Sequence, residues 1–369
     1  MMKTKVGLLV ETPEMVGGIQ AAARRHGSLL GDGYEVVPVC FETTRAEKDW
    51  SGRRERVAGG WRVSAADLKS DNAAVAGSSA EHQRHDMRYR SFADHLVEIV
   101  REENLDLLHA FGCFHQRGLL AAFAAAKTGI PYMLSLRGVD LESRIFDEKS
   151  LPALSASLPG AAAVACVSED SRRLLERVLR PRAPVFVVPN SLDPAEFERG
   201  PVSLPLLERA DLPVIGCFGK FRRVTGLDFL LKAFDLVNRR RPCVLLLAGG
   251  LQKREVEYYN ALIESLPSAP NIVRLGHVPH ARVLDYMALC DVVAAPSVSD
   301  ACPNKVLEAM HAGVPLVAAA AGGIPELAVH GREALLVPPR TVEPLADAIE
   351  ASLADPSAAR RRAAPAHPP

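Results

Sequence analysis

Short aliphatic runs recur along the whole sequence and are separated by stretches long enough to form a helix. Strands that are apolar throughout are typical of a parallel sheet buried on both faces, and parallel strands need helix-sized connections. The sequence therefore predicts an α/β chain with parallel sheets. The expected strands are 5–10, 34–40, 105–110, 132–136, 163–167 and 185–189, followed by a second series at 214–218, 243–248, 271–275, 291–296, 315–319 and 334–338.

A proline-punctuated stretch, SLDPAEFERGPVSLPLLERADLP, separates the two series and is typical of a linker. The 369 residues are also more than one ordinary core requires. We predict an N-terminal domain at 1–195, a linker at 196–212 and a C-terminal domain at 213–350. Both are expected to be doubly wound, Rossmann-like sheets that face a deep cleft. Such sheets bind ligands at the carboxyl ends of their strands, so we expect the functional site in this cleft.

Helical periodicity is clearest after the first strand of the second series. One face of this predicted helix is apolar and carries Leu227, Leu230, Leu231, Phe234 and Val237. The other face is expected to be solvated and carries Asp228, Lys232, Asp235 and Arg239.

Two segments show no convincing periodicity. Residues 43–90 are rich in charge, Gly and Ser, and we expect an irregular excursion from the first domain. The low-complexity tail at 351–369 is expected to be disordered or truncated.

Composition excludes several classes of protein. The 44 basic and 44 acidic residues cancel, so a nucleic-acid partner is not expected. Seven scattered cysteines without metal-ligand spacing are typical of a reduced, cytoplasmic chain. No apolar run reaches the roughly 18 residues of a membrane span.

The segment PSVSDACPNKVLEAMHAGVP, at 296–315, places two carboxylates around one predicted helix start. Pro303 suits the beginning of a helix, so Asn304 and Lys305 would lie at an N-terminus whose free N–H groups attract phosphate. Glu308, one turn further in, could accept hydrogen bonds from a ribose diol, and Asp300 from a second sugar. A nucleotide-sugar has this order of parts, although either acid alone could be a helix cap or a solvated side chain.

This segment resembles the donor site of the family 4 retaining glycosyltransferases, the glycosyl transferases of group 1, which have the two-domain GT-B fold. Further resemblances follow in the family's order at VGGIQ (16–20), VSED (167–170), VPNSLD (188–193), FGKF (218–221), LAGG (247–250), GHVP (276–279), GGIPEL (322–327) and GREALLVPP (331–339).

The resemblance implies that Glu308 binds the nucleotide ribose and that Asp300, in place of the usual Glu, holds hydroxyls of the transferred sugar. Lys220, after Gly219, matches the family's diphosphate-binding Arg. Thr225 occupies the place of a second basic residue that stabilises the leaving diphosphate.

Two neighbouring arginines could compensate for Thr225. Arg222 and Arg223 are close in sequence, and for either of them a solvated surface position is the alternative.

In the first domain, Arg137 stands in SLRGVD where the resemblance implies a His. An arginine cannot act as an acid or base near neutral pH, so Arg137 would bind a phosphate of the donor or of a lipid-linked acceptor; an arginine paired with Asp140 is the alternative. Gly17 and Gly18 would let the backbone approach the donor phosphates, and a plain turn is their alternative. The segment EMVGGIQ lacks the G-x-G-x-x-G pattern, which argues against an NAD enzyme.

The resemblance implies a metal-independent hexosyltransferase in polysaccharide or glycolipid biosynthesis. It would move a sugar, with retention, from a nucleotide-sugar donor to a hydroxyl of a glycan or lipid-linked acceptor. The expected catalytic residues are Asp300, Lys220 and Arg137, without a cofactor. The resemblance also implies peripheral contact with the inner face of the membrane. Two alternatives remain: a nucleotide-sugar epimerase on the same fold, and a catalytically weak binding or scaffold protein.

Overall fold

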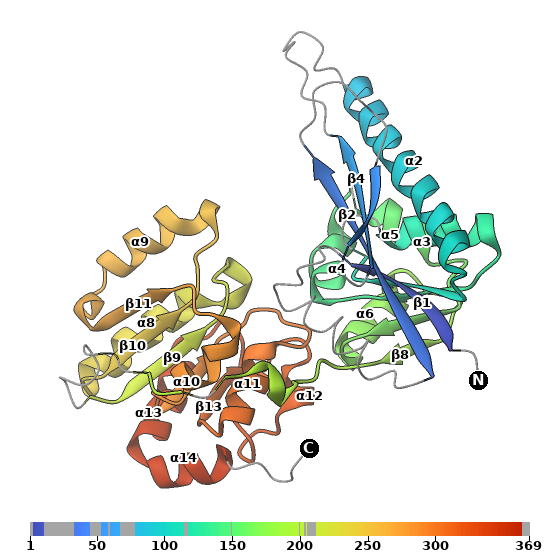
Figure 1. Cartoon of the computed structure of the whole chain (residues 1–369). Coiled ribbons are helices and arrows are strands. Elements are labelled where there is room, and N and C mark those ends of the chain that lie inside the picture. The colour runs from blue at the N-terminus through green and yellow to red at the C-terminus, as the bar shows by residue number, and fades with distance from the viewer. Residues whose placement is uncertain are drawn as a thin grey trace. The chain divides into compact units, whose positions relative to one another are not determined.

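The computed structural model describes two compact units of the chain (Figure 1). The first comprises Met1–Val167 with Ser171–Pro189, and the second comprises Ser168–Asp170 with Asn190–Pro369. The described residues are 3–10, 33–44, 53–57, 60–66, 78–113, 117–148, 150–198, 200–202, 204 and 212–363.

The first unit is built on an eight-stranded sheet in the order β3-β4-β2-β1-β5-β6-β7-β8. All described pairs in it are parallel except β3 with β4. Its strands are β1 (Thr4–Val10), β2 (Tyr34–Thr44), β3 (Arg53–Val57), β4 (Gly60–Ala66), β5 (Leu107–Phe111), β6 (Tyr132–Ser135), β7 (Ala163–Cys166) and β8 (Val185–Val187).

Helices cover this sheet and close its core, which includes Leu96, Leu108, Leu120 and Leu134. The longest helix, α2, runs along β4 (Figure 1). The helices are α2 (Ser78–Glu103), α3 (Arg117–Thr128), α4 (Gly138–Glu142), α5 (Leu151–Ser157) and α6 (Glu169–Val178).

The prediction of an irregular excursion at 43–90 was wrong. The end of β2, the strands β3 and β4 and the first part of α2 lie in this range. Strand β3 is an exposed edge strand of sequence RRERV, so it has no apolar face for a pattern to reveal. Ion pairs connect β3 to α2: Arg54 lies 3.2 Å from Glu98 and 3.3 Å from Glu102.

The second unit has a six-stranded sheet, parallel throughout, in the order β11-β10-β9-β12-β13-β14. Its strands are β9 (Val214–Phe218), β10 (Val244–Ala248), β11 (Ile272–Gly276), β12 (Val292–Ala295), β13 (Leu316–Ala319) and β14 (Leu335–Val337). The twelve strands predicted from sequence are therefore all confirmed, with ends that differ by a few residues.

Two apolar clusters flank this second sheet. Alternate residues of β10 belong to different clusters, Leu245 to one and Leu246 to the other, as the two faces of a strand require. Helices α8 and α13 pack in the first cluster, whereas α10 and α11 pack in the second. The helices are α8 (Leu227–Arg240), α9 (Val256–Glu264), α10 (Val283–Met287), α11 (Asn304–Ala312), α12 (Ile324–Leu327), α13 (Glu343–Ala354) and α14 (Pro356–Ala363).

Helix α8 confirms the apolar face predicted for it, since all five of its predicted residues are buried. Asp235, however, is buried rather than solvated. Its carboxylate accepts a hydrogen bond from the Ser268 N–H at 3.3 Å and pairs with Arg239 at 2.5 Å, so these partners offset the cost of its burial.

Both the predicted linker and the predicted tail contain packed residues. Phe197 is buried in the core of the second unit. Helix α13 extends to Ala354, and α14 follows it with Ala359 and Ala363 buried, so a disordered tail beginning at residue 351 was wrong. Residues 364–369 lie outside the described part of the chain.

Each sheet has a point at which the strand order reverses. It lies between β1 and β5 in the first unit and between β9 and β12 in the second. Doubly wound sheets bind ligands at the carboxyl ends of the strands beside this point. Lys220 follows β9 directly, and Asp300 follows β12. The cleft expected between the domains stays a prediction.

Candidate donor site

The loops after β9 and β10 lie in close backbone contact. The N–H of Gly219 donates to the carbonyl oxygen of Ala248 at 3.0 Å. Gly249 has φ +151°, and a Cβ at this position would lie 1.7 Å from the Gly219 carbonyl oxygen. Only glycine is tolerated in this contact. Lys220 then follows with an exposed side chain at the edge of the strand-order reversal.

The segment after Lys220 is organised by Thr225. Its hydroxyl accepts the N–H of Arg222 at 3.0 Å and donates to the Arg222 carbonyl oxygen at 2.6 Å. These two hydrogen bonds close the short helical turn Arg223–Thr225. Thr225 is therefore part of a capping arrangement that leads into α8.

The two arginines beside this turn have different surroundings. The Arg223 guanidinium lies 5.1 Å from the centre of the Tyr258 ring, as in a cation–π contact. Within the described part of the chain, the buried Nε of Arg222 has no hydrogen-bond partner. No described contact shows that either arginine compensates for Thr225, so that role stays a prediction.

Asp300 lies in the loop after β12 and is paired with a lysine. Its Oδ2 lies 3.2 Å from the ammonium of Lys305 and 3.5 Å from the hydroxyl of buried Ser297. Its carbonyl oxygen accepts the N–H of Gly323 at 3.1 Å. The loop thus brings Asp300 and Lys305, which were both predicted as site residues, into one ion pair.

Helix α11 begins at Asn304 after Pro303, as predicted. Among the described residues, none provides a hydrogen-bond partner for the buried Oδ1 of Asn304. Cys302 before it is buried, and its carbonyl oxygen accepts a hydrogen bond from the Asn190 side-chain amide at 2.7 Å. The segment before α11 is thus held by Asn190, and the helix itself follows β12, one of the two strands at the strand-order reversal.

Glu308 lies one turn further along α11 and is almost fully buried. Its Oε1 is 3.7 Å from Nδ1 of His280, and the other ring nitrogen of His280 is 3.5 Å from Glu196. The Phe197 ring packs against the His280 ring at 5.0 Å between centres. Sequence reasoning missed His280, although it directly follows the GHVP segment.

Arg137 lies in the first unit and is buried there. Its guanidinium lies 4.8 Å from the centre of the Phe111 ring, and its backbone N–H donates to Asp140 at 2.8 Å. Asp140 also accepts the Cys113 N–H at 3.1 Å, and burial raises the pKa of its carboxyl. The backbone partnership of Arg137 with Asp140 is therefore local and structural, while the predicted phosphate contact stays a prediction. Gly17 and Gly18 lie outside the described residues.

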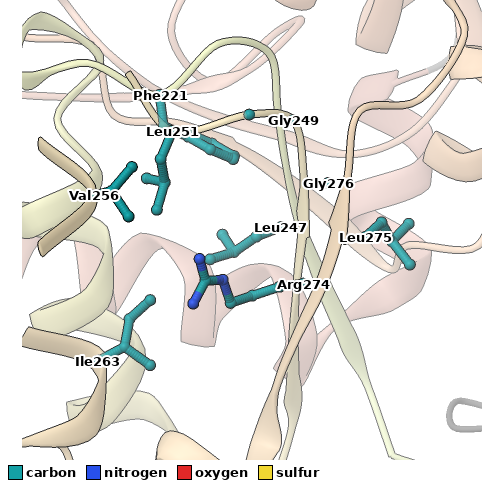
Figure 2. A pocket seen from close by; sticks show the side chains of 10 residues that line it. Phe221, Leu247, Gly249, Leu251, Val256, Ile263, Arg274, Leu275 and Gly276 are labelled. Carbon is teal, nitrogen blue, oxygen red and sulfur yellow. The ribbon is translucent and has the colours of Figure 1, made fainter. Parts of the chain in front are cut away.

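A hollow of about 470 Å³ adjoins the loops after β10 and β11 (Figure 2). Apolar side chains line most of it, among them Phe221, Leu247 and Ile263. The guanidinium of Arg274 points into this apolar surround in Figure 2, and one of its nitrogens donates to Asn260 at 2.9 Å. Sequence analysis did not predict the hollow, although the LAGG and GHVP segments flank it.

Within the described ranges, no three His, Cys, Asp or Glu side chains are grouped closely enough to hold a metal ion. In the same ranges, no helix has both the length and the hydropathy needed to cross a bilayer.

Comparison with known families bears on this geometry. A family described as "Glycosyl transferases group 1" matches residues 212–355, and one described as "Glycosyl transferase 4-like domain" matches residues 17–191. The chain belongs to the glycosyl transferases of group 1. The resemblance drawn from the donor-site segment is confirmed, and with it the GT-B class of fold.

Curated relatives of this group 1 glycosyltransferase differ in activity. It is 26% identical to a putative teichuronic acid biosynthesis glycosyltransferase of Bacillus subtilis, over 71% of this chain and 65% of that protein. It is 27% identical to the 2-deoxystreptamine glucosyltransferase of Streptomyces kanamyceticus, over 71% of each chain.

Solved structures share the fold of this group 1 glycosyltransferase at low identity. Sucrose-phosphate synthase of Thermosynechococcus elongatus matches with a TM-score of 0.74 at 20% identity, over 98% of this chain and 92% of that one. Anabaena HepE in complex with UDP-glucose matches with a TM-score of 0.71 at 19% identity, over 97% of this chain and 92% of that one.

Proposed function

We propose that this protein transfers a sugar from a nucleotide-sugar to an acceptor hydroxyl with retention at the anomeric carbon. The main support for this proposal is the arrangement of residues at the carboxyl ends of β9 and β12. In the second unit, Lys220 follows β9 and the loop with Asp300 follows β12, so both come after the two strands at the strand-order reversal, and α11 begins next with Glu308 one turn in. A cation, free N–H groups and two carboxylates suit a diphosphate between two sugars.

Each part of a donor has a proposed partner. Lys220 and the α11 N-terminus bind the diphosphate, Glu308 binds the ribose hydroxyls and Asp300 binds the transferred sugar. The hollow beside Gly249 has the size and the apolar lining to receive a base. The structure of HepE in complex with UDP-glucose supports a nucleotide-sugar as the class of donor.

The proposed reaction exchanges one C–O bond for another. The bond between the anomeric carbon and the β-phosphate oxygen breaks, and its electron pair leaves with the nucleoside diphosphate. The acceptor oxygen bonds to the same face of the carbon, and its proton passes to the leaving phosphate oxygen. Negative charge builds up on the diphosphate during this step, so positive groups beside it lower the barrier.

The acceptor and the cellular setting belong to the proposal as well. We propose a glycan or lipid-linked acceptor in polysaccharide or glycolipid biosynthesis, reached by peripheral contact with the cytoplasmic face of a membrane. The relative named for teichuronic acid biosynthesis supports a polysaccharide product. We also propose that no metal is required, because basic side chains and a helix N-terminus act on the diphosphate.

A product assay tests this function. The wild type is incubated with UDP-, GDP- and ADP-sugars, with and without simple glycoside acceptors, and products are analysed by NMR with and without a chelator. Release of nucleoside diphosphate with a product of unchanged anomeric configuration is expected. Interconversion of the sugar without transfer would favour an epimerase, whereas an inert panel would favour a binding or scaffold protein.

A further inference from the structure

The diphosphate part of the proposed site lacks one positive charge. Thr225 stands where the resemblance implies a basic residue, and its hydroxyl is engaged in both directions with the Arg222 backbone. The Arg223 guanidinium lies against the Tyr258 ring. Lys220 and Arg223 are both exposed cations of the loop after β9, but only Lys220 occupies a position that the resemblance assigns to the diphosphate.

Lys305 is a second cation at the same place. Its side chain is only 13% exposed, and its ammonium lies 3.2 Å from Asp300. It also lies close enough to Cys217, the penultimate residue of β9, to oppose the rise that burial causes in the pKa of that thiol. The ammonium is therefore paired with the loop after β12, and its charge also acts on the end of β9.

Helix stability does not explain this position. Lys305 is in the first turn of α11, where the helix dipole disfavours a cation. Burial of an ammonium also carries a desolvation cost, which Asp300 offsets. A second anion bound at the helix start would interact favourably with both the ammonium and the N–H groups.

We propose that Lys305 supplies the second positive charge for the leaving diphosphate and that Asp300 holds Lys305 in place. This inference rests on the proposed function. An ionised carboxylate has acceptor capacity for both an ammonium and a sugar hydroxyl, so Asp300 keeps its role toward the transferred sugar. Lys305 then acts where the β-phosphate gains negative charge as the C–O bond breaks.

The test compares Lys305→Gln with Lys232→Gln. Glutamine can still donate a hydrogen bond to Asp300, so the substitution removes the charge and spares the loop, while Lys232 is an exposed lysine of α8. Calorimetry measures binding of UDP and UMP, GDP and GMP, and ADP and AMP. For the base that the wild type binds, Lys305→Gln should lower the affinity for the nucleoside diphosphate about tenfold and leave that for the monophosphate almost unchanged. The kcat of Lys305→Gln should fall about 100-fold.

A rescue variant separates charge from structure. Introducing Thr225→Lys into Lys305→Gln returns a cation to the diphosphate and should recover at least tenfold in kcat. Equal weakening of diphosphate and monophosphate, or unchanged kcat in Lys305→Gln, would overturn the role of Lys305 while leaving the transferase intact. A wild type that binds none of these nucleotides would overturn both.

Discussion

At the residue scale, Asp300 and Glu308 illustrate how two carboxylates of one segment acquire different surroundings. The Asp300 side chain is 27% exposed and paired with Lys305, whereas that of Glu308 is 8% exposed and close to His280. The acids themselves were predictable from sequence, because their spacing around Pro303 indicates a helix start. Their partners were not, since His280 and Glu308 are brought together only by the fold.

Two buried thiols of the second unit provide a prediction about pH. Burial raises the pKa of Cys217 and of Cys243 to about 12 from an ordinary 9.0. The unfolded chain therefore loses these protons first, so the free energy of unfolding should fall as pH rises above about 9. Urea unfolding across this range measures the effect.

The same two thiols should resist alkylation by iodoacetamide near pH 8 in the native protein, because the thiolate is the reactive form. Peptide mass spectrometry follows the label, with the urea-unfolded chain as control. Native labelling of Cys217 as fast as in that control would show that the thiol is accessible and ionised.

At the scale of elements, hydrophobic periodicity predicted the buried strands and helix faces but missed the strand whose contacts with a helix are ion pairs. The apolar face of α8 and the twelve strands follow from hydrophobic patterns that packing requires. Strand β3 and the beginning of α2 gave no such signal, because the edge strand RRERV is anchored to α2 by ion pairs. Asp235 was placed on the wrong side for a related reason: its partner Ser268 is 33 residues away.

The loop after β13 supports the loop that carries Asp300. Gly322 has φ +56°, and a Cβ there would lie 2.4 Å from the Asp300 carbonyl oxygen. Gly331 has φ +78°, and no atom of the described residues lies within 4 Å of such a Cβ, which makes Gly331 a matched control. Gly331→Ala should lower the free energy of unfolding by about 1–2 kcal/mol, because alanine is strained in the left-handed conformation.

Gly322→Ala should cost more than Gly331→Ala, because the clash adds to the strain and displaces Asp300. Urea midpoints measure stability, and calorimetry with UDP-, GDP- and ADP-sugars measures donor binding. Donor affinity should fall only in Gly322→Ala. Similar midpoints and equal affinities for both variants would contradict the supporting role of this contact.

At the scale of the whole molecule, two doubly wound units place their strand-order reversals at β1/β5 and at β9/β12. This duplication was visible in the sequence as two series of aliphatic runs. We propose that the second unit recognises the nucleotide, because the described donor-site residues lie there. Specificity for one base and one sugar depends on side-chain geometry that apolar periodicity does not encode.

Hydrogen exchange should reveal this division. A bound nucleotide-sugar is expected to slow amide exchange in peptides that contain residues 219–226 and 296–308, because it orders the loops and contacts the free N–H groups of α11. Peptides that contain β3 and β4 serve as the internal control. Protection confined to β3 and β4 would contradict the assignment of the donor to the second unit.

The most direct test is titration calorimetry of the wild type, Glu308→Ala and Glu333→Ala with UDP-, GDP- and ADP-sugars. Glu333 is a matched acid outside the site, which accepts the Val329 N–H at 2.8 Å. We expect one class of donor to bind the wild type and Glu333→Ala alike. Its affinity for Glu308→Ala should be at least tenfold lower, because this substitution removes charge-assisted hydrogen bonds to the ribose. Equal affinity for Glu308→Ala and the wild type would contradict donor binding at this site.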